Sequence, residues 1–539
     1  MALYHRPAER NAAAVHAQTA GLHRKGTRTL TIDPKYLSDA AHFPGGHAAG
    51  IVAPRSTQEV QAIVRNAASL LPIGAQSSLT GGATPMGELV LSTEKLTRIL
   101  SAGSTHATVA AGVSIAVLQA TLAEHGAWFP AAPTFTGAVA GGVVATNAAG
   151  AATFKYGSVR AWVDALVVVL ADGSELSVRR GQYVADDRML RVPTAAGVVG
   201  VRVPSYRMPD VVKRSAGYHA APGMDLIDLF IGSEGTLGVI TQVTFRAVSP
   251  APTTALALVP CRSEAAALAL VADLRRASAD TWRSKDVCGI DAAAIEHMDH
   301  RSIEILREDG ADRRNDVGFP DGIDVALLVQ LELPAGTSAS DAFDQIQAAA
   351  TSSTDGSLMR FCRLLSEHDL LDDTELALPG NPRRAEQLIA VREAVPAGVN
   401  QRVGRAQRDV DPRIAKTAAD MIVPFDRFAD MMDVYRGGFR AHGLDFAVWG
   451  HISDGNVHPN VLPRSYDEME RGKDAILQFG HEVGRLGGCP LAEHGVGRSP
   501  VKQALLRGLY GAAGIDEMRE VKRTLDPEWK LAPGVIFTR

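Results

Sequence analysis

The chain of 539 residues is longer than one hydrophobic core usually supports, so its length indicates about two to four domains. The hydrophobic fraction of 46% and the charged fraction of 21% are typical of soluble globular proteins, and a net charge of −5 without a long basic run argues against a nucleic-acid-binding protein. The four cysteines, Cys261, Cys288, Cys362 and Cys489, are widely separated, which argues against a disulfide framework or an internal iron–sulfur cluster and favours a reducing compartment.

Two stretches could be taken for targeting or membrane segments. The first runs through Arg28, is rich in alanine and has Glu9 as its only acidic residue. We interpret residues 1–45 as a lead-in outside the folded domains, with a transit peptide as the alternative. The second, Gly126–Phe154, is uncharged and long enough to span a bilayer, but it contains prolines and no Leu or Ile. We therefore expect tightly packed backbone near a ligand there, and no transmembrane segment.

The first predicted elements lead into a glycine-rich loop. A short strand at residues 51–54 precedes a helix with a capping box formed by Ser56 and Glu59, and apolar residues continue one helix face to Leu71. A strand of about three residues then enters Gly74–Gly82. Small residues expose backbone N–H groups that can bind a pyrophosphate, although neither a P-loop nor GxGxxG is present. An ordinary surface turn is the alternative.

Further strands and small residues follow in the first half of the chain. The predicted strands are Leu89–Leu91, residues 106–111, Ala165–Leu170 and Ser174–Val178. The last two form a hairpin through Asp172-Gly173, and a helix capped by Ser114 ends at Gly126. A second glycine-dense turn joins the apolar runs of Phe230–Ile240. Such small residues permit close approach of the backbone to a flat ligand.

The second half has a different character. Ser249-Pro-Ala-Pro252 is a predicted domain boundary. Beyond it, strands such as Ala326–Leu331 alternate with Ala-rich helices at residues 263–277 and 340–350, as in an α+β domain. Two charged inserts are expected to be loops. They are Arg307–Asp321 and Asp372–Arg384.

Two segments near the end of the chain can form a metal site. His451 and His458 flank an Asp-Gly-Asn turn, so both imidazoles can point to one side. Glu493 and His494 follow and precede two glycines. Two imidazoles and one carboxylate are a usual ligand set for a divalent metal with open positions, and His494 would remain to transfer a proton. Structural histidines in a site without metal are the alternative.

These blocks, in this order, resemble the FAD-linked oxidases and dehydrogenases of the vanillyl-alcohol-oxidase superfamily, which have a PCMH-type FAD-binding domain. Within it, the sequence is most similar to the D-lactate, glycolate and D-2-hydroxyglutarate dehydrogenases. The similarity covers roughly residues 36–539. Its matching blocks are Pro72–Gly82, Gly141–Gly150, Lys155–Gly157, Gly232–Gly238, the two metal-like segments, Lys522–Pro527 and Pro533-Gly534. Ser453 departs from the family, which usually has glycine there.

The resemblance implies an α+β fold in two parts. Residues 46–248 would form the two-subdomain FAD-binding domain, and residues 249–539 the substrate and metal domain, with a C-terminal segment returning to the flavin. No histidine in these blocks matches the covalent flavin attachment of some family branches, so we predict non-covalent FAD. The predicted cofactor-binding residues are Pro72, Gly74, Ala75, Gln76, Ser77, Ser78, Leu79, Thr80, Gly81, Gly82, Pro133, Gly137, Gly141, Gly142, Ala145, Thr146, Asn147, Gly150, Tyr156, Gly157, Glu234, Gly235, Gly238, Ile240 and Asn456.

The resemblance also implies an activity, the oxidation of a D-2-hydroxy acid to the 2-oxo acid with hydride transfer to flavin N5. His451, His458 and Glu493 would hold a divalent metal, zinc or manganese, and His494 would be the base. Arg392 is placed to bind the substrate carboxylate, with a helix-surface ion pair as the alternative, and Lys416 is a candidate second cation.

Other functions remain open at this point. The chain could be an oxidase or synthase of the same superfamily that acts on a substrate without a carboxylate, a metal-dependent hydrolase, or a flavin-binding subunit without activity. The predicted partners are a small 2-hydroxy acid and a separate electron acceptor, either a cytochrome, a quinone, an electron-transfer flavoprotein or O₂. A cytoplasmic location is expected, with association at the inner membrane or a mitochondrial location as alternatives. Homodimer formation is left open.

Overall fold

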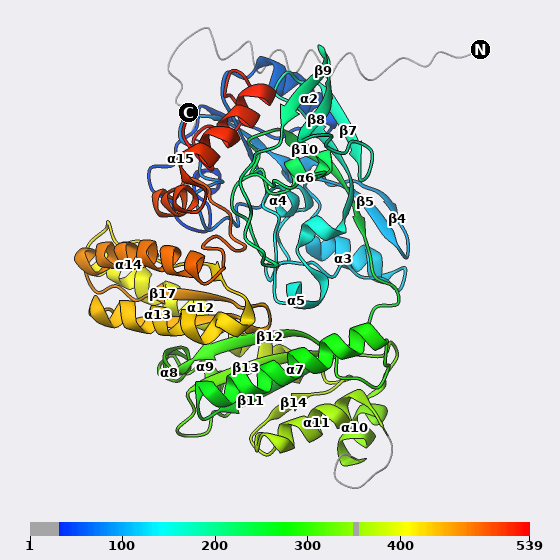
Figure 1. Ribbon diagram of the computed structural model, residues 1–539, viewed down its shortest axis with the longest axis vertical. Coiled ribbons are helices and arrows are strands. Elements are labelled where there is room, and N and C mark those ends of the chain that lie inside the picture. Colours follow the sequence, from blue (N-terminus) through cyan, green and yellow to red (C-terminus); the bar gives the residue numbers. More distant parts are fainter. Residues whose placement is uncertain (1–31, 349–354) are drawn as a thin grey trace.

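The computed structural model describes residues 32–348 and 355–539, so most of the expected lead-in lies outside the described residues. Figure 1 shows two parts, one built from the first half of the chain together with the C-terminal helix, and one built from the remainder. The overall fold is α+β, as predicted.

The first part begins with a small parallel sheet in the order β1–β3–β2. Its elements are β1 (Gly50–Val52), α2 (Thr57–Asn66), β2 (Leu70–Ile73) and β3 (Leu89–Ser92). The capping box is confirmed on one side, because the Ser56 hydroxyl accepts a hydrogen bond from the Glu59 amide at 3.2 Å. The loop between β2 and β3 contains Gly74–Gly82, which therefore starts at the carboxyl end of a buried strand.

The second sheet of this part has the order β4–β5–β10–β6–β7, and its neighbouring strands are antiparallel. The strands are β4 (Ile99–Ala102), β5 (His106–Ala110), β6 (Val163–Val169), β7 (Glu175–Arg179) and β10 (Val239–Arg246). The predicted β6–β7 hairpin is confirmed. The helices are α3 (Ile115–Ala123), α4 (Ala140–Ala145), α5 (Thr153–Tyr156) and α6 (Leu226–Phe230), and a separate hairpin consists of β8 (Met189–Thr194) and β9 (Gly197–Arg202).

A seven-stranded sheet forms the centre of the second part, in the order β14–β11–β13–β12–β16–β17–β15. Its strands are β11 (Thr253–Cys261), β12 (Ala292–Asp299), β13 (Val325–Leu333), β14 (Glu375–Ala377), β15 (Met421–Ile422), β16 (Phe446–His451) and β17 (Asn456–Val461). The pairing of β16 with β17 brings His451 opposite Asn456 and Trp449 opposite His458. The two predicted ligand histidines therefore lie at the ends of adjacent strands.

Helices cover both faces of this sheet. The apolar residues of α8 and α12 pack with one face, and those of α7, α11, α13 and α14 belong to the core cluster on the other. These helices and their shorter neighbours are α7 (Glu264–Ser284), α8 (His300–Glu308), α9 (Ala311–Arg314), α10 (Ala339–Ala348), α11 (Ser357–Glu367), α12 (Pro382–Asp409), α13 (Phe428–Ala441) and α14 (Tyr466–Arg485).

The end of the chain returns to the first part, as the resemblance implies. Helix α15 (Pro500–Leu525), red in Figure 1, lies against the first half of the chain. The segment after it pairs Leu531 with Leu70 in a parallel bridge, and the Leu70 amide donates to the Lys530 carbonyl at 2.7 Å. The C-terminal tail thus extends the edge of the first sheet next to the strand that leads into Gly74–Gly82.

Some expectations about element ends were wrong. Helix α2 does not reach Leu71, because Ala67 adopts an extended backbone and the chain enters β2, where pairing with the tail outweighs the apolar helical spacing. The two charged inserts are not simple loops. Arg307–Asp321 includes the end of α8 and α9, and Asp372–Arg384 includes β14 and the start of α12. Within the described residues, no helix is long and apolar enough to cross a membrane, and Gly126–Phe154 contains only short helices.

Candidate active site

A cleft in the first part of the molecule is lined by the glycine-rich segments and ends at Glu493 and His494. The glycines have a steric reason. A Cβ on Gly74 would lie 2.5 Å from Val139, and one on Gly235, where φ is +74°, would lie 2.7 Å from Pro72. The predicted cofactor residues that line this cleft are Pro72, Gly74, Ala75, Gln76, Ser77, Ser78, Leu79, Gly82, Pro133, Gly141, Gly142, Ala145, Thr146, Glu234, Gly235, Gly238 and Ile240.

The remaining predicted cofactor residues lie outside this lining. They are Thr80, Gly81, Gly137, Asn147, Gly150, Tyr156, Gly157 and Asn456. The Tyr156 hydroxyl donates to Glu332 of β13 at 2.5 Å, so it joins the two parts of the molecule. Asn456 is fully buried and donates to Asp420 at 3.1 Å, which places it in the histidine cluster.

The three predicted metal ligands converge. The Nε2 atoms of His451 and His458 lie 3.4 and 3.3 Å from the same oxygen, Oε1 of Glu493. In a tetrahedral site with metal–ligand bonds of about 2.0–2.1 Å, ligand atoms are about 3.3–3.4 Å apart. These two spacings suit a zinc-like ion. The described donor atoms that all lie within 4.8 Å of one another are those of Asp420, His458, Glu493 and His494, a group that does not include His451.

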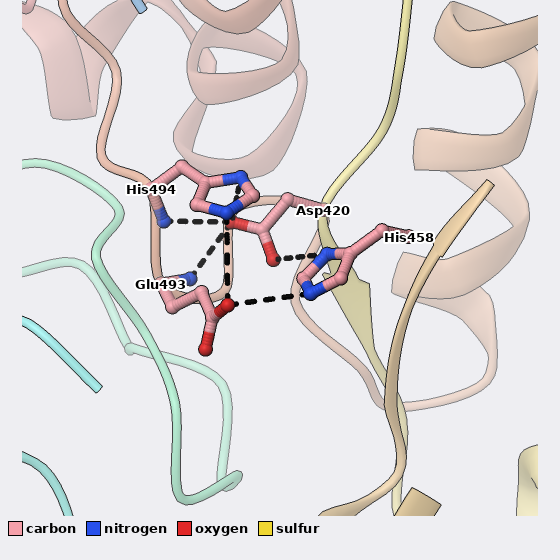
Figure 2. A group of neighbouring side chains, drawn as sticks. All are labelled: Asp420, His458, Glu493 and His494. Atoms are coloured by element: carbon pink, nitrogen blue, oxygen red, sulfur yellow. Dashed lines mark hydrogen bonds and ion pairs between the residues drawn. The ribbon is translucent and has the colours of Figure 1, made fainter. Parts of the chain in front are cut away.

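Asp420 is a member of this cluster that the sequence analysis did not identify. It precedes β15, and Figure 2 shows it between His458 and His494. Its Oδ1 lies 3.5 Å from His458 Nδ1, and its Oδ2 lies 3.3 Å from His494 Nδ1 and accepts the amides of Glu493 at 2.9 Å and His494 at 2.7 Å. Although burial opposes ionisation, the neighbouring His494 and His458 lower the pKa of Asp420 far below its usual range. Asp420 is thus an anion that lies beside two imidazoles.

Glu296 of β12 orients the third imidazole. Its Oε1 lies 2.7 Å from His451 Nδ1, while its Oε2 accepts Nε and Nη2 of Arg392 at 2.9 and 2.7 Å. Burial opposes ionisation, but Arg392 and His451 lower the pKa of Glu296 to about 2. Because Glu296 is ionised, Nδ1 of His451 is the donor, and Nε2 points toward Glu493. Arg392 of α12 is therefore engaged in an ion pair, but its partner is the buried Glu296 of β12 and not a neighbour on the helix surface.

Charge in the cluster favours a cation among the three ligand atoms. Burial opposes protonation of His451, yet Glu296 raises its pKa to about 9. Burial also opposes ionisation of Glu493, yet Lys213 and His451 lower its pKa well below the usual range. Without a metal, His451 is therefore a cation beside Glu493, and a metal ion bound at its Nε2 would take the place of that proton. The described residues therefore fit a divalent metal.

His494 is the cluster imidazole that faces the cleft. Its side chain is 26% exposed, whereas those of His451 and His458 are 2% and 8% exposed. Burial is the main cause that lowers the pKa of His494 to about 4, while Asp420 opposes this shift. The imidazole is therefore neutral at pH 7. With Nδ1 toward Asp420, Nε2 lies 3.6 Å from Glu493 Oε1 at the end of the cleft and is the nitrogen that can accept a proton.

Two lysines besides Lys213 lie near the cluster. Lys416 is half-buried, and burial together with Lys502 lowers its pKa to about 8. Lys502, at the start of α15, is buried, and its Nζ has no hydrogen-bond partner among the described residues. Burial lowers the pKa of Lys502, while Asp420 and Glu234 oppose that shift. The sequence pattern gave no signal for Lys502.

Ser453, which departs from the family pattern, fits the turn between the histidines. Its hydroxyl accepts the Ile295 amide of β12 at 3.2 Å, and Arg275 donates to its carbonyl. Positive φ in this turn occurs at Gly455, where φ is +85° and a Cβ would lie 2.1 Å from the Val423 carbonyl oxygen. A side chain at residue 453 therefore does not disturb the ligand geometry.

Comparisons with known proteins agree with this arrangement. Residues 48–179 match the family model described as FAD binding domain, and residues 261–536 match the one described as FAD linked oxidases, C-terminal domain. The chain is 28% identical over 499 residues to a D-2-hydroxyglutarate dehydrogenase of Xanthomonas citri pv. viticola, covering 90% of this chain and 89% of that protein. It is 27% identical over 500 residues to a D-lactate dehydrogenase of Archaeoglobus fulgidus, covering 91% of each.

A glycolate oxidase subunit of Bacillus subtilis is similarly related, with 27% identity over 499 residues, 91% of this chain and 89% of that protein. Among solved structures, an alkyldihydroxyacetonephosphate synthase has the same fold, with a TM-score of 0.54 at 15% sequence identity, covering 90% of this chain and 75% of that one. At that identity the likeness concerns the fold alone.

Proposed function

Because the chain belongs to the FAD-linked oxidases, we propose that it oxidises a D-2-hydroxy acid to the corresponding 2-oxo acid. The observation that carries this proposal is a neutral imidazole, His494, at the end of the cleft and beside a histidine–carboxylate cluster. The substrate class is supported by relatives named D-2-hydroxyglutarate dehydrogenase, D-lactate dehydrogenase and glycolate oxidase subunit.

Two groups complete the site in this proposal. FAD, held without a covalent bond along the cleft, supplies the hydride acceptor when bound. A divalent metal, zinc or manganese, held by His451, His458 and Glu493, would lower the pKa of a hydroxyl that binds beside it. The donor set and its spacing support such an ion.

The chain's own contribution to the reaction is management of one proton. Oxidation of a hydroxy acid removes the hydroxyl proton and, with its electron pair, the hydrogen on Cα. Nε2 of His494 accepts the hydroxyl proton, and the resulting imidazolium is stabilised by Asp420, 3.3 Å from Nδ1. The amides of Glu493 and His494 keep Asp420 in position, so the base is oriented before substrate binds.

Cations near the cluster would bind the substrate carboxylate. Arg392 uses Nε and Nη2 for Glu296, and its remaining N–H groups are the ones proposed for the substrate. Lys416 is the second proposed cation. The nearby Lys502 adds positive charge, and its Nζ has no hydrogen-bond partner among the described residues. A carboxylate entering this region would gain charge-assisted hydrogen bonds.

The proposal includes further assignments. Residues 46–248 hold FAD, and residues 249–539 supply the substrate and metal site. The four cysteines are unpaired and apart, so electrons leave through a separate acceptor, for which a cytochrome, a quinone, an electron-transfer flavoprotein and O₂ are the candidates. We place the protein in the cytoplasm on the basis of its cysteine usage.

Anaerobic mixing of the flavin-loaded protein with D- and L-2-hydroxy acids tests the function. We expect the D-series to bleach the flavin and the L-series to leave it oxidised. Bleaching by an alcohol or aldose but by no hydroxy acid would favour another chemistry of the same fold. A colourless preparation that hydrolyses esters or amides would favour the metal-dependent hydrolase.

The metal is tested on the same sample by elemental analysis and chelation. Removal of the ion should abolish flavin reduction, and returning Zn²⁺ or Mn²⁺ should restore it. Full reduction in a preparation verified to contain no metal would contradict this part of the proposal while leaving the flavin chemistry intact.

A further inference from the structure

Lys213 is fully buried at the metal-ligand cluster, although it belongs to the first part of the chain, between β9 and α6. Its Nζ lies 3.0 Å from Glu493 Oε2, 3.1 Å from Asp454 Oδ2 and 3.2 Å from Asn456 Oδ1. The contact with Asn456 is a hydrogen bond, and those with Glu493 and Asp454 are ion pairs. Because the Lys213 side chain is fully buried among these partners, it is not available to bind substrate.

The three oxygens around Lys213 come from both ligand-bearing segments. Asp454 and Asn456 lie in the turn between His451 and His458, and Glu493 is the third ligand. A single cation therefore links the histidine turn to the carboxylate. Lys213 forms an ion pair with Oε2 of Glu493, while Oε1 lies 3.3 and 3.4 Å from the Nε2 atoms of His458 and His451.

We propose that Lys213 is a positioning residue that limits Glu493 to one metal-binding oxygen and so keeps a coordination position open for substrate. A carboxylate can bind a metal through one oxygen or both, and binding through both would take the place of a substrate oxygen. The inference rests on the proposed function, in that it concerns the same metal site. It assigns to this lysine the role that outer partners of metal ligands have in other sites.

The neighbouring Ser215 provides a matched control. Its amide donates to the Ala492 carbonyl at 2.8 Å, and its hydroxyl donates to the Thr146 carbonyl at 3.1 Å. Ser215 is buried in the same segment as Lys213, and its hydroxyl donates to backbone carbonyls rather than to a ligand carboxylate. Ser215→Ala should therefore leave metal binding unchanged.

The test measures metal binding rather than turnover. The zinc dissociation constant is obtained by competition with a chelator, and the visible spectrum of the Co²⁺-loaded, FAD-free protein reports coordination number. For Lys213→Met we expect a dissociation constant about 10–100-fold higher and weaker Co²⁺ bands, as on an increase in coordination number. Lys213→Arg, which keeps the charge, should recover most of the affinity.

Wild-type zinc affinity together with a wild-type Co²⁺ spectrum in Lys213→Met would overturn the inference. If that variant does not fold, the double variant Lys213→Met/Asp454→Asn removes the lysine together with one opposing charge. It should show the same loss of affinity, and unchanged binding would be decisive against the role of Lys213. A wild-type protein that binds no zinc would instead defeat the metal part of the proposed function, and this inference with it.

Discussion

Asp420→Asn is the substitution that tests the proposed proton transfer most directly. Asp420 Oδ2 lies 3.3 Å from His494 Nδ1, so its charge acts on an imidazolium that exists only once the substrate proton has been accepted. Two unit charges at this distance interact by about 5 kcal/mol at an effective dielectric constant of about 20. The amide keeps a carbonyl dipole, so only part of this stabilisation is lost.

The expected result is a fall of about 10²–10³-fold in the rate of flavin reduction, corresponding to about 3–4 kcal/mol. The assay is anaerobic stopped-flow bleaching of the flavin by the hydroxy acid that reduces the wild type best. Flavin and metal contents are measured in each preparation, because Asp420 also lies 3.5 Å from His458, a proposed ligand. Asp426→Asn is the control, since Asp426 is exposed and follows the same strand.

A reduction rate within about threefold of the wild type, at equal flavin and metal content, would refute the reasoning. It would mean that the charge of Asp420 does not stabilise the protonated base. If the rate and the metal content fall together, Asp420 acts by supporting the proposed ligand His458 and not by stabilising the protonated His494.

Three further predictions follow from the same site. His494→Ala should lower the rate of flavin reduction by about 10²-fold or more without loss of FAD, and near-normal reduction by the variant would remove His494 as the base. In the wild type, where the pKa of His494 is about 4, the rate of flavin reduction should be constant above about pH 5 and fall below it. Arg392→Met should raise KM for the hydroxy acid by about 10–100-fold, since a charge-assisted hydrogen bond contributes about 1.5–3 kcal/mol. An unchanged KM together with weaker metal binding would mean that Arg392 holds Glu296 and does not bind the substrate. The pKa of Glu296 is lowered from 4.5 to about 2, so its ionised form stabilises the fold above about pH 4.5, and this contribution is lost as pH falls toward 2. The free energy of unfolding in urea should therefore depend less on pH in that range for Glu296→Gln than for the wild type. Identical pH profiles would contradict the assignment.

The features that the sequence predicted well are those with a local cause. A loop such as Gly74–Gly82 is set by the steric needs of a few consecutive residues, and the turn between His451 and His458 needs the positive φ of Gly455. The apolar spacing that extended α2 to Leu71 is equally local, yet it failed because Leu70 bonds to Lys530, which lies 460 positions later. Sequence patterns cannot show which distant segment will compete for a strand edge.

The partners of the ligands illustrate the same limit. Asp420 precedes a strand of two residues, Glu296 lies within a buried strand, and Lys213 lies in a segment without regular structure. None of them has a spacing that distinguishes it from other charged residues. Each becomes informative only when β12, β15 and the segment before α6 meet at the cluster.

The distribution of these partners has a consequence for how the site is assembled. Each imidazole lies beside a carboxylate, Glu296 for His451 and the shared Asp420 for His458 and His494. Each of these carboxylates is held in turn by groups from another element. Buried carboxylates remain ionised only when such partners are present. One partner of Glu493, Lys213, comes from the first part of the molecule, so the site is complete only when that part and the seven-stranded sheet have come together. The ligand geometry and the orientation of the base are therefore properties of the complete fold rather than of the His451–His458 turn alone.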